Sequence, residues 1–411
     1  MLDFPAGALF RHIIKRGELT VTDATGKRHH YAGSPGESTA ITLHDKALHW
    51  KLVANPSINL PEAYMFGTMT IDDGDLDKFL RVLAANNQAF RDFPFAKAIT
   101  LARYALRRIW QNNAIGYATK NIQFHYDISN ELYQLFLDKD MQYSCAYFKS
   151  EHDTLEQAQI NKKNHIIAKL NLSPGQRVLD IGCGWGGLAM EMAKQKGVSV
   201  VGVTLSAQQH QLAVERVKAA GLQDKIDIRL QDYRHVSETF DRIVSVGMFE
   251  HVGLPHYPEY FGKVHELMKE DGLMLLHSIG YNKPSLATQP WLEKYMFRKG
   301  YLPALSETIP FIEKAGFWVT DAEVLRLHYS YTLREWKKRY RANSERIRAM
   351  NGEVFYRMFD LYLTGCELAM IYSGTMAWQI QFSKKINALP ITRDYMYGGQ
   401  AESELLRKLA V

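Results

Sequence analysis

A glycine-rich turn directly after a short apolar strand is the feature that most constrains this chain. The strand, residues 177–181, carries an acid at Asp180, and residues 182–187 then read Gly-Cys-Gly-Trp-Gly-Gly. Apolar residues recur at helical spacing from there to Lys196. Because glycine has no side chain, such a strand–turn–helix lets backbone approach a bound nucleotide closely. The pattern predicts an α/β fold with a nucleotide-like ligand at this turn.

Which nucleotide the turn holds depends on the neighbouring residues. The spacing of Gly182, Gly184 and Gly187 fits the dinucleotide fingerprint, but a dinucleotide site usually has an acid at the end of the next strand. That strand, residues 198–203, runs instead into Thr204-Leu205-Ser206. The acid before the glycines is similar to that of the S-adenosylmethionine (AdoMet) methyltransferases. AdoMet is therefore favoured over NAD, and over a turn that holds no ligand.

Composition limits the classes of protein that remain. With 411 residues, 46% of them hydrophobic, the chain can bury the cores of about two to three domains. No apolar run reaches about 18 residues, and residues 1–17 lack a secretory signal pattern. The three cysteines have neither disulfide-framework nor zinc-ligand spacing, so we expect a reducing cytoplasm and no metal. The net charge of +6 is compatible with an anionic lipid surface, or with simple solubility.

Strands and helices are expected to alternate from about residue 175 onward. Strands are predicted at 177–181, 199–203, 226–230, 241–246 and 272–279, with helices such as 206–220 between them. This alternation predicts a parallel sheet covered on both faces, with ligands beyond the carboxyl ends of its strands. A helical insertion at 281–315 and a long helical stretch at 333–384 are expected to follow.

The remaining part of the chain divides into two predicted segments. Residues 1–90 are expected to form a small non-catalytic α+β domain, with a strand pair at 19–31, a strand-like stretch at 39–53 that is broken at 44–46, and a helix at 76–90. Residues 91–125 are predicted to be a linking helical segment with a basic and an apolar face, and residues 126–411 the catalytic domain.

Polar side chains at the predicted strand ends are candidates for chemistry. Glu250 follows the fourth strand, where a carboxylate orients a base or steadies a cation, or is only a helix N-terminal acid. His277 ends an apolar run, and a buried imidazole there has either a specific partner or a structural hydrogen bond. The aromatic segment 143–148 either covers the cofactor pocket or is a packed loop, and its spacing does not decide between them.

Several short blocks occur together in one order along the chain. This set resembles the cyclopropane-fatty-acid synthases and their mycolic-acid relatives from about residue 115 to 390, and more weakly in the N-terminal domain. The blocks are Tyr143-Ser144-Cys145-Ala146-Tyr147-Phe148, Gly182-Cys183-Gly184-Trp185-Gly186, Thr204-Leu205-Ser206, Phe249-Glu250-His251, Leu276-His277 and His328-Tyr329-x-x-Thr332-Leu333.

The resemblance implies a fold, a reaction and partners. The fold would be a class I AdoMet-dependent methyltransferase, Rossmann-like with a mostly parallel sheet and helical insertions, plus the small N-terminal α+β domain. The reaction would place a methylene from AdoMet across the cis double bond of an unsaturated phospholipid acyl chain, with bound bicarbonate as the base. A methyl-branched, methylene or hydroxylated chain is the alternative product. The resemblance also implies a homodimer that associates peripherally with the inner face of the membrane.

Site residues follow from the same resemblance. The bicarbonate cradle would combine the backbone N–H groups of Cys145 and Ile279 with the side chains of Glu250, His277 and Tyr329. Cys366 matches a cysteine that the family often marks as catalytic, although a buried cysteine behaves as a small apolar residue. The residues expected to bind AdoMet are Tyr143, Ser144, Asp180, Gly182, Cys183, Gly184, Trp185, Gly186, Thr204, Leu205, Ser206, Gln209, Gln231 and Asp232.

The chemistry of an alkene agrees with this assignment. Because deprotonation cannot activate a double bond, catalysis has to come from positioning, from stabilising positive charge and from excluding water. Two rival classes are a lipid-binding scaffold with an inactive methyltransferase fold and a nucleic-acid methyltransferase. The second would need an Asn/Asp-Pro-Pro-Tyr or Pro-Cys motif after the fourth strand, where Phe249-Glu250-His251 stands instead. We therefore expect no nucleic-acid partner.

Overall fold

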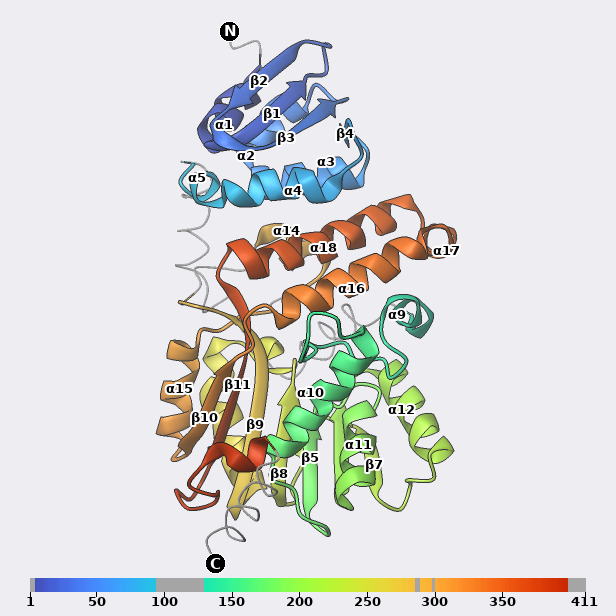
Figure 1. Cartoon of the computed structure of the whole chain (residues 1–411), viewed down its shortest axis with the longest axis vertical. Helices are drawn as coiled ribbons and strands as arrows, with labels where there is room; N and C mark the ends of the chain where they lie inside the picture. Colours follow the sequence, from blue (N-terminus) through green and yellow to red (C-terminus); the bar gives the residue numbers. More distant parts are fainter. Residues whose placement is uncertain (1–3, 94–128, 285–288, 298–299, 398–411) are drawn as a thin grey trace, which may run out of the picture. The chain divides into compact units, whose positions relative to one another are not determined.

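The computed structural model describes residues 4–93, 129–284, 289–297 and 300–397, which fall into two compact units (Figure 1). The first unit joins residues 1–110 to 285–298 and 330–375. The second joins 111–284, 299–329 and 376–411. The predicted linking segment, 91–125, lies almost entirely outside the described residues, so the division of the chain at 90 and 125 stays a prediction.

A seven-stranded sheet forms the centre of the second unit, in the order β10-β11-β9-β8-β5-β6-β7. The pairs β5–β6, β6–β7, β5–β8 and β8–β9 are parallel, and β10 pairs antiparallel with β11. The predicted α/β fold with a mostly parallel sheet is thus confirmed, with all five predicted strands. The strands are β5 (Arg177–Ile181), β6 (Ser199–Thr204), β7 (Ile226–Leu230), β8 (Phe240–Val246), β9 (Met268–Tyr281), β10 (Trp318–Val324) and β11 (Thr375–Ser383).

Helices cover both faces of this sheet and enclose a separate core on each (Figure 1). Successive strand residues point to opposite faces, so Val200 joins one core and Val201 the other. The first face is covered by α10 (Leu155–Lys169), α11 (Gly187–Lys196) and α12 (Ala207–Ala219), and the second by α13 (Tyr257–Leu267) and α15 (Leu305–Lys314). Burial on both faces leaves the strand ends as the place for polar groups.

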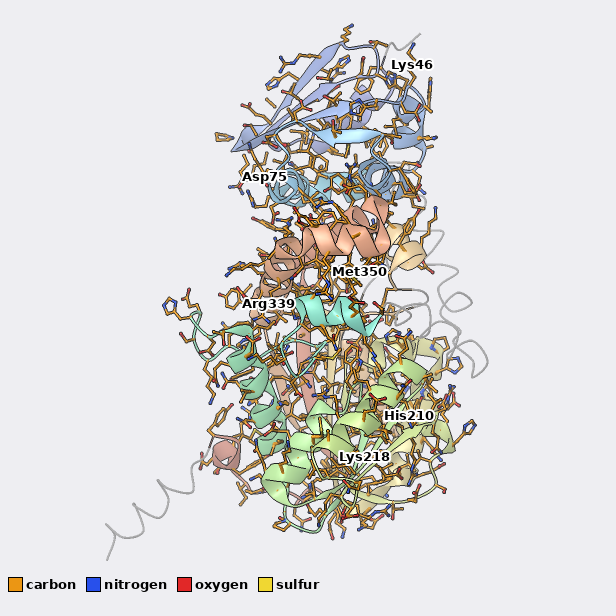
Figure 2. The ribbon with its side chains drawn as sticks, turned by 90° about the vertical axis from the view of Figure 1, so that its right-hand side faces the viewer. Lys46, Asp75, His210, Lys218, Arg339 and Met350 are labelled. Atoms are coloured by element: carbon orange, nitrogen blue, oxygen red, sulfur yellow. The ribbon has the colours of Figure 1, made fainter. Side chains whose placement is uncertain are left out.

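The first unit contains a four-stranded sheet in the order β2-β1-β3-β4. Asp75 caps the start of α4 (Figure 2), since its carboxylate accepts a hydrogen bond from the Lys78 backbone N–H at 2.8 Å. The elements are α1 (Ala6–Ile13), β1 (Arg16–Thr22), β2 (Arg28–Ala32), β3 (Ser34–Leu43), α2 (Leu48–Ala54), α3 (Pro56–Met65), β4 (Met69–Ile71), α4 (Leu76–Ala85), α5 (Asn87–Arg91) and α14 (Pro290–Tyr295).

Ion pairs connect α4 to helices from the C-terminal part of the chain within this unit. Lys337 bonds to Asp77 and also to Glu367, at 2.5 Å. Arg341 bonds to Asp360 at 2.7 Å and to Asp77. The helices are α16 (His328–Ala342), α17 (Ser344–Asn351) and α18 (Glu353–Tyr372). Charges this well buried are costly unless paired, so the network specifies how α4, α16 and α18 associate.

The prediction of one helical stretch over 333–384 was wrong at its end, and β10 was missed. Residues 375–383 form β11, which lies between β9 and β10. Residues 376–378 are apolar and extend the apolar pattern of the preceding helix, although the alternation of Gln379 and Gln381 with Ile380 and Phe382 is typical of a strand. The predicted insertion 281–315 contains only α14 and α15 as helices among its described residues.

Two smaller predictions for the N-terminal part were also wrong. The strand-like stretch expected at 39–53 is broken after Leu43, as predicted, but its second half is not a strand, because residues 48–54 form α2. The helix expected at 76–90 is interrupted at Asn86, whose side-chain oxygen accepts hydrogen bonds from the backbone N–H groups of Lys15 and Arg16. A tertiary contact of this kind is not visible in helical periodicity. Across the described ranges, no helix is long and apolar enough to cross a bilayer.

Candidate functional site

The glycine-rich turn after β5 adopts backbone conformations that favour glycine. Gly182 has a φ of +84°, and a Cβ built on it would lie 2.8 Å from Met248 Cβ. Gly186 has a φ of +77° and occupies the N-cap position of α11. The left-handed conformation and the close neighbour both exclude a side chain, so the turn keeps its backbone open toward the carboxyl ends of the strands.

A pocket lies at this edge of the sheet, beyond the ends of β5, β6, β7 and β8. Of the fourteen predicted cofactor residues, all but Gly186 and Ser206 line it; those two begin α11 and α12. The other lining residues are Met141, Gln142, Lys162, Ile181, Leu188, Val203, Tyr233, Arg234, Val246, Gly247, Met248, His251, Val252 and His256. The residues that the sequence brought together on motif grounds thus share one cavity, while their role in binding stays a prediction.

Asp180 is an unusual group in the wall of this pocket. Its side chain is buried, and its Oδ2 atom has no hydrogen-bond partner among the described residues. Burial raises the pKa of Asp180 to about 7, against the opposing effect of Lys162. An unpaired buried carboxyl is costly to the fold alone, which is typical of a group arranged for a ligand.

Lys162 is a pocket residue that sequence reasoning missed. It lies on α10 and is 2% exposed. Its Nζ donates to Ser144 Oγ at 2.9 Å and to Gln142 Oε1. Burial lowers the pKa of Lys162 to about 8. A lysine on a helix normally faces solvent, so the sequence gives no sign that Lys162 is buried. Only the position of α10 beside the pocket shows it.

The polar side chains at the ends of β6 and β7 form hydrogen bonds within the protein. Thr204 Oγ1 donates to Gln209 Oε1 at 2.9 Å, and Ser206 caps α12 by accepting from the Gln209 backbone N–H. Asp232 accepts two hydrogen bonds from the Arg234 guanidinium, at 2.9 and 2.6 Å. Burial opposes ionisation of Asp232, but these bonds hold its pKa below the usual value. A ligand hydroxyl would therefore meet an ionised carboxylate there.

A second polar cluster forms where η2 (Phe249–His251) meets β9. Glu250 is 2% exposed, and its Oε1 accepts a hydrogen bond from the Ile279 backbone N–H at 2.6 Å. Its Oε2 is buried with no hydrogen-bond partner in the described part of the chain. Burial raises the pKa of Glu250 to about 7. His277 lies two residues before Ile279 on the same strand and is 1% exposed.

Cys145 and Tyr329 are both buried. Contacts between residues close to them in the sequence join their two segments. Tyr147 stacks between His328, with ring centroids 4.7 Å apart, and His165, at 4.3 Å. The Phe148 backbone N–H donates to His328 Nδ1 at 3.1 Å. The residue before Tyr329 is thus fixed to the segment that follows Cys145. The aromatic segment 143–148 both lines the pocket, through Tyr143 and Ser144, and packs as a core.

Cys366 lies apart from these groups in the chain's organisation. It is on α18, in the first compact unit, whereas the other predicted catalytic groups belong to the second. Burial raises the pKa of its thiol to about 12, so the thiolate is scarce at neutral pH. The side chain is only partly buried, and a catalytic role for Cys366 stays a prediction.

Comparisons with known proteins agree on one family. A family profile described as mycolic acid cyclopropane synthetase matches residues 115–380. The cyclopropane-fatty-acyl-phospholipid synthase of Escherichia coli strain K12 is 41% identical over 344 residues, which cover 84% of this chain and 87% of that protein. Cyclopropane mycolic acid synthase 3 of Mycobacterium tuberculosis H37Rv is 37% identical over 259 residues, covering 60% of this chain and 90% of the relative.

Solved structures give the same result for the fold. The cyclopropane synthase MmaA2 from Mycobacterium tuberculosis superposes with a TM-score of 0.62 at 32% identity, covering 65% of this chain and 98% of that one. Mycolic acid cyclopropane synthase CmaA1, complexed with SAH and CTAB, gives a TM-score of 0.61 at 34% identity, covering 64% and 97%.

Proposed function

This chain belongs to the mycolic acid cyclopropane synthetase family and is an AdoMet-dependent enzyme of lipid cyclopropanation, and we propose that it acts on the cis double bond of an unsaturated phospholipid acyl chain. The observation that carries the phospholipid assignment is the coverage of the Escherichia coli relative, whose printed name specifies fatty acyl phospholipids and which matches 84% of this chain. That match extends well beyond the part of the chain aligned with the mycolic-acid relative, which is 60%.

AdoMet is proposed to occupy the pocket at the strand ends. The glycine-rich turn allows close approach of the backbone, and the Asp180 carboxylate would face a ligand that carries a sulfonium and an ammonium group. Lys162 holds Ser144, and through it the aromatic segment that walls the pocket. A carboxylate whose pKa lies near neutrality ionises readily when a cation binds beside it.

Bicarbonate is proposed to bind beside Glu250, and the hydrogen-bonding character of the cluster fits that ion. Bicarbonate offers one O–H donor and otherwise accepts, so its site needs one acceptor among several donors. The unpaired Oε2 of Glu250 is that acceptor, and His277, Tyr329 and the Cys145 backbone N–H are the donors. The Ile279 N–H acts by fixing Glu250, to which it already donates. When bound, the ion supplies a base for the proton that the lipid releases.

The proposed reaction requires no side-chain nucleophile. The sulfur–methyl bond of AdoMet breaks as the alkene forms a carbon–carbon bond to that methyl group, which leaves a carbocation on the chain. Loss of one methyl proton then lets the second carbon–carbon bond close the ring. The carboxyl of Glu250, with a pKa of about 7, holds a proton readily at this step. Phe249 and Leu276, the chain neighbours of Glu250 and His277, belong to an apolar core, which supports a site shielded from the water that would quench the cation.

Because the acyl chain lies in a bilayer, the proposal includes contact with the inner membrane surface. The homodimer implied by the resemblance also remains part of this proposal.

Incubation with trideuteromethyl AdoMet and monounsaturated phosphatidylglycerol vesicles tests the function. The expected product gains one carbon that retains two of the three deuterium atoms, and NMR separates a ring from a methylene branch. A product that keeps all three deuterium atoms, or that also gains water, would identify a different fate of the same cation. Lipid without added carbon would refute the proposal.

Substitution of Lys162 by methionine is expected to weaken AdoMet binding about tenfold, because Ser144 loses a charged hydrogen-bond donor. Calorimetric titration of AdoMet measures this change. Lys169→Met is the matched control, since Lys169 is equally buried on α10 but pairs with Asp321 and Glu323. Equal losses of affinity in both variants would assign the effect to the helix as a whole.

Substitution of Cys366 by alanine is expected to leave turnover within about threefold of the wild type, because the partly buried thiol is protonated at neutral pH. The thermal midpoint should fall modestly. A loss of turnover of 100-fold or more, in an alanine variant that keeps its thermal midpoint, would restore a chemical role for this cysteine.

A further inference from the structure

The partner of His277 comes from a strand that carries no family motif. Gln379 lies on β11, next to β9 in the sheet, and is 1% exposed. Its side-chain Nε2 lies 3.2 Å from His277 Nδ1. The two side chains are 102 positions apart in the chain and both are enclosed, so no solvent competes for this contact.

The direction of this hydrogen bond fixes where the imidazole carries its proton. An amide nitrogen only donates, so Nδ1 accepts and the single N–H of a neutral imidazole is at Nε2. Gln379 Oε1 is buried with no partner among the residues described. Turning the amide by half a rotation would instead leave its NH₂ group facing those surroundings. As placed, one amide N–H bonds to His277, which leaves the second N–H and Oε1. The turned amide would leave two N–H groups instead, and an unpaired buried N–H is rarer in proteins than an unpaired oxygen.

The surroundings of His277 keep it neutral. Burial is the main effect that lowers its pKa, to about 3. Lys162, Lys169 and His165 of α10 lower it further, and Glu323 of β10 raises it. A neutral imidazole has two tautomers, and which one forms depends on the group that bonds to the second nitrogen.

We propose that Gln379 is a positioning residue that holds His277 as the Nε2–H tautomer and so provides the anion cradle beside Glu250 with an N–H donor. Without Gln379 the imidazole would present a bare nitrogen to the anion in part of the molecules. The inference rests on the proposed function of His277 as a donor to a bound anion.

Three variants test the assignment in the full-length protein. Gln379→Met removes the donor at similar size, and Gln379→Glu replaces it with an acceptor. Gln381→Met is the matched control, because Gln381 is fully buried on the same face of β11 but donates to the Lys169 carbonyl, at 2.6 Å, and to Tyr395. The readouts are ¹⁵N NMR of ring-labelled histidines, assigned by subtraction of a His277→Asn spectrum, together with turnover, AdoMet affinity and thermal midpoint.

The wild type is expected to show His277 protonated at Nε2 only. Gln379→Met should mix the tautomers and lower turnover about tenfold, the value of one hydrogen bond, with AdoMet affinity unchanged. In Gln379→Glu the carboxylate accepts from Nδ1–H, so Nε2 keeps its proton only while the ring is an imidazolium. The ratio of variant to wild-type turnover should therefore fall about tenfold as pH rises from about 6 to 9. Gln381→Met should lower the thermal midpoint without changing the His277 signals.

A wild-type spectrum with Nδ1 protonated would overturn the assignment. A Gln379→Met variant with the same turnover as an active wild type would also overturn the assignment. If Gln379→Glu fails to fold, the methionine variant and the wild-type spectrum decide alone. A wild type that makes no lipid product would instead refute the proposed function, while the spectrum, which needs no substrate, would still decide the tautomer.

Discussion

Replacement of Glu250 by glutamine is expected to lower turnover by about 10²–10³-fold while AdoMet affinity stays within about twofold of the wild type. One carboxylate oxygen accepts from the Ile279 N–H and the other is buried and unpaired. A glutamine has a single acceptor oxygen, so its NH₂ group must face either the Ile279 N–H or the position of the anion. If the NH₂ group faces the anion, the acceptor that bicarbonate requires is lost. If it faces the Ile279 N–H, two donors oppose each other and the side chain loses the hydrogen bond that positions it.

The pH dependence gives this prediction a second readout. The pKa of Glu250 is raised to about 7, so its acceptor is lost as pH falls below that value. Wild-type turnover, measured at constant bicarbonate concentration, should decline below about pH 7, whereas the residual activity of the glutamine variant should lack that limb. Glu266→Gln, which changes an exposed carboxylate on the same helix, α13, is the control. Near-normal turnover of the Glu250 variant on unsaturated vesicles would contradict the proposed cradle.

Replacement of Asp180 by asparagine is expected to weaken AdoMet binding by about 100-fold at pH 8, because the ligand's positive charge loses a buried counter-charge. The pKa of Asp180 is about 7 in the protein alone, so a cation binds best once this group is ionised. Wild-type affinity should therefore increase as pH rises through 7, and the asparagine variant should show no such increase. Calorimetric titration at several pH values measures both effects.

The free energy of unfolding of the ligand-free protein should decrease as pH rises through 7, whereas AdoMet affinity should increase. The folded-state pKa of Asp180 lies above the ordinary value of 3.8, so between about pH 4 and 7 the folded protein binds more protons than the unfolded chain. The protonated carboxyl of Asp180 thus contributes to the stability of the folded protein at low pH, and this contribution is lost as pH rises through that window. Asp180→Asn should thus be more stable than the wild type by a few kcal/mol at pH 8, and about equal at pH 4.

Glu250→Gln is the matched control for this pair of effects, because burial raises both carboxyl pKa values to about 7. Both variants should gain stability in urea unfolding at pH 8, but only the Asp180 variant should lose AdoMet affinity. Loss of affinity in both, or in neither, would mean that the two carboxyls do not serve separate ligands.

Short sequence patterns were enough to predict the part of the site whose residues lie close together in the chain. The β5 turn, the strand ends and the capping residue Ser206 all follow from residues within a few positions of one another. Most of the predicted cofactor residues consequently line one pocket. Lys162 and Gln379 were missed because each acts on a residue far away in the chain, from an element whose periodicity shows burial but not its neighbours.

The order in which the sheet's strands occur in the chain matters for synthesis on the ribosome. β10 ends at Val324, and its neighbour β11 begins only at Thr375, about fifty residues later. During that interval β10 has no strand beside it, and an unpaired strand edge invites association with another nascent chain. The strands around the glycine-rich turn are synthesised well before Gln379, the residue that bonds to His277. A chain released before β11 would therefore lack both the strand that pairs with β10 and the side chain that bonds to His277.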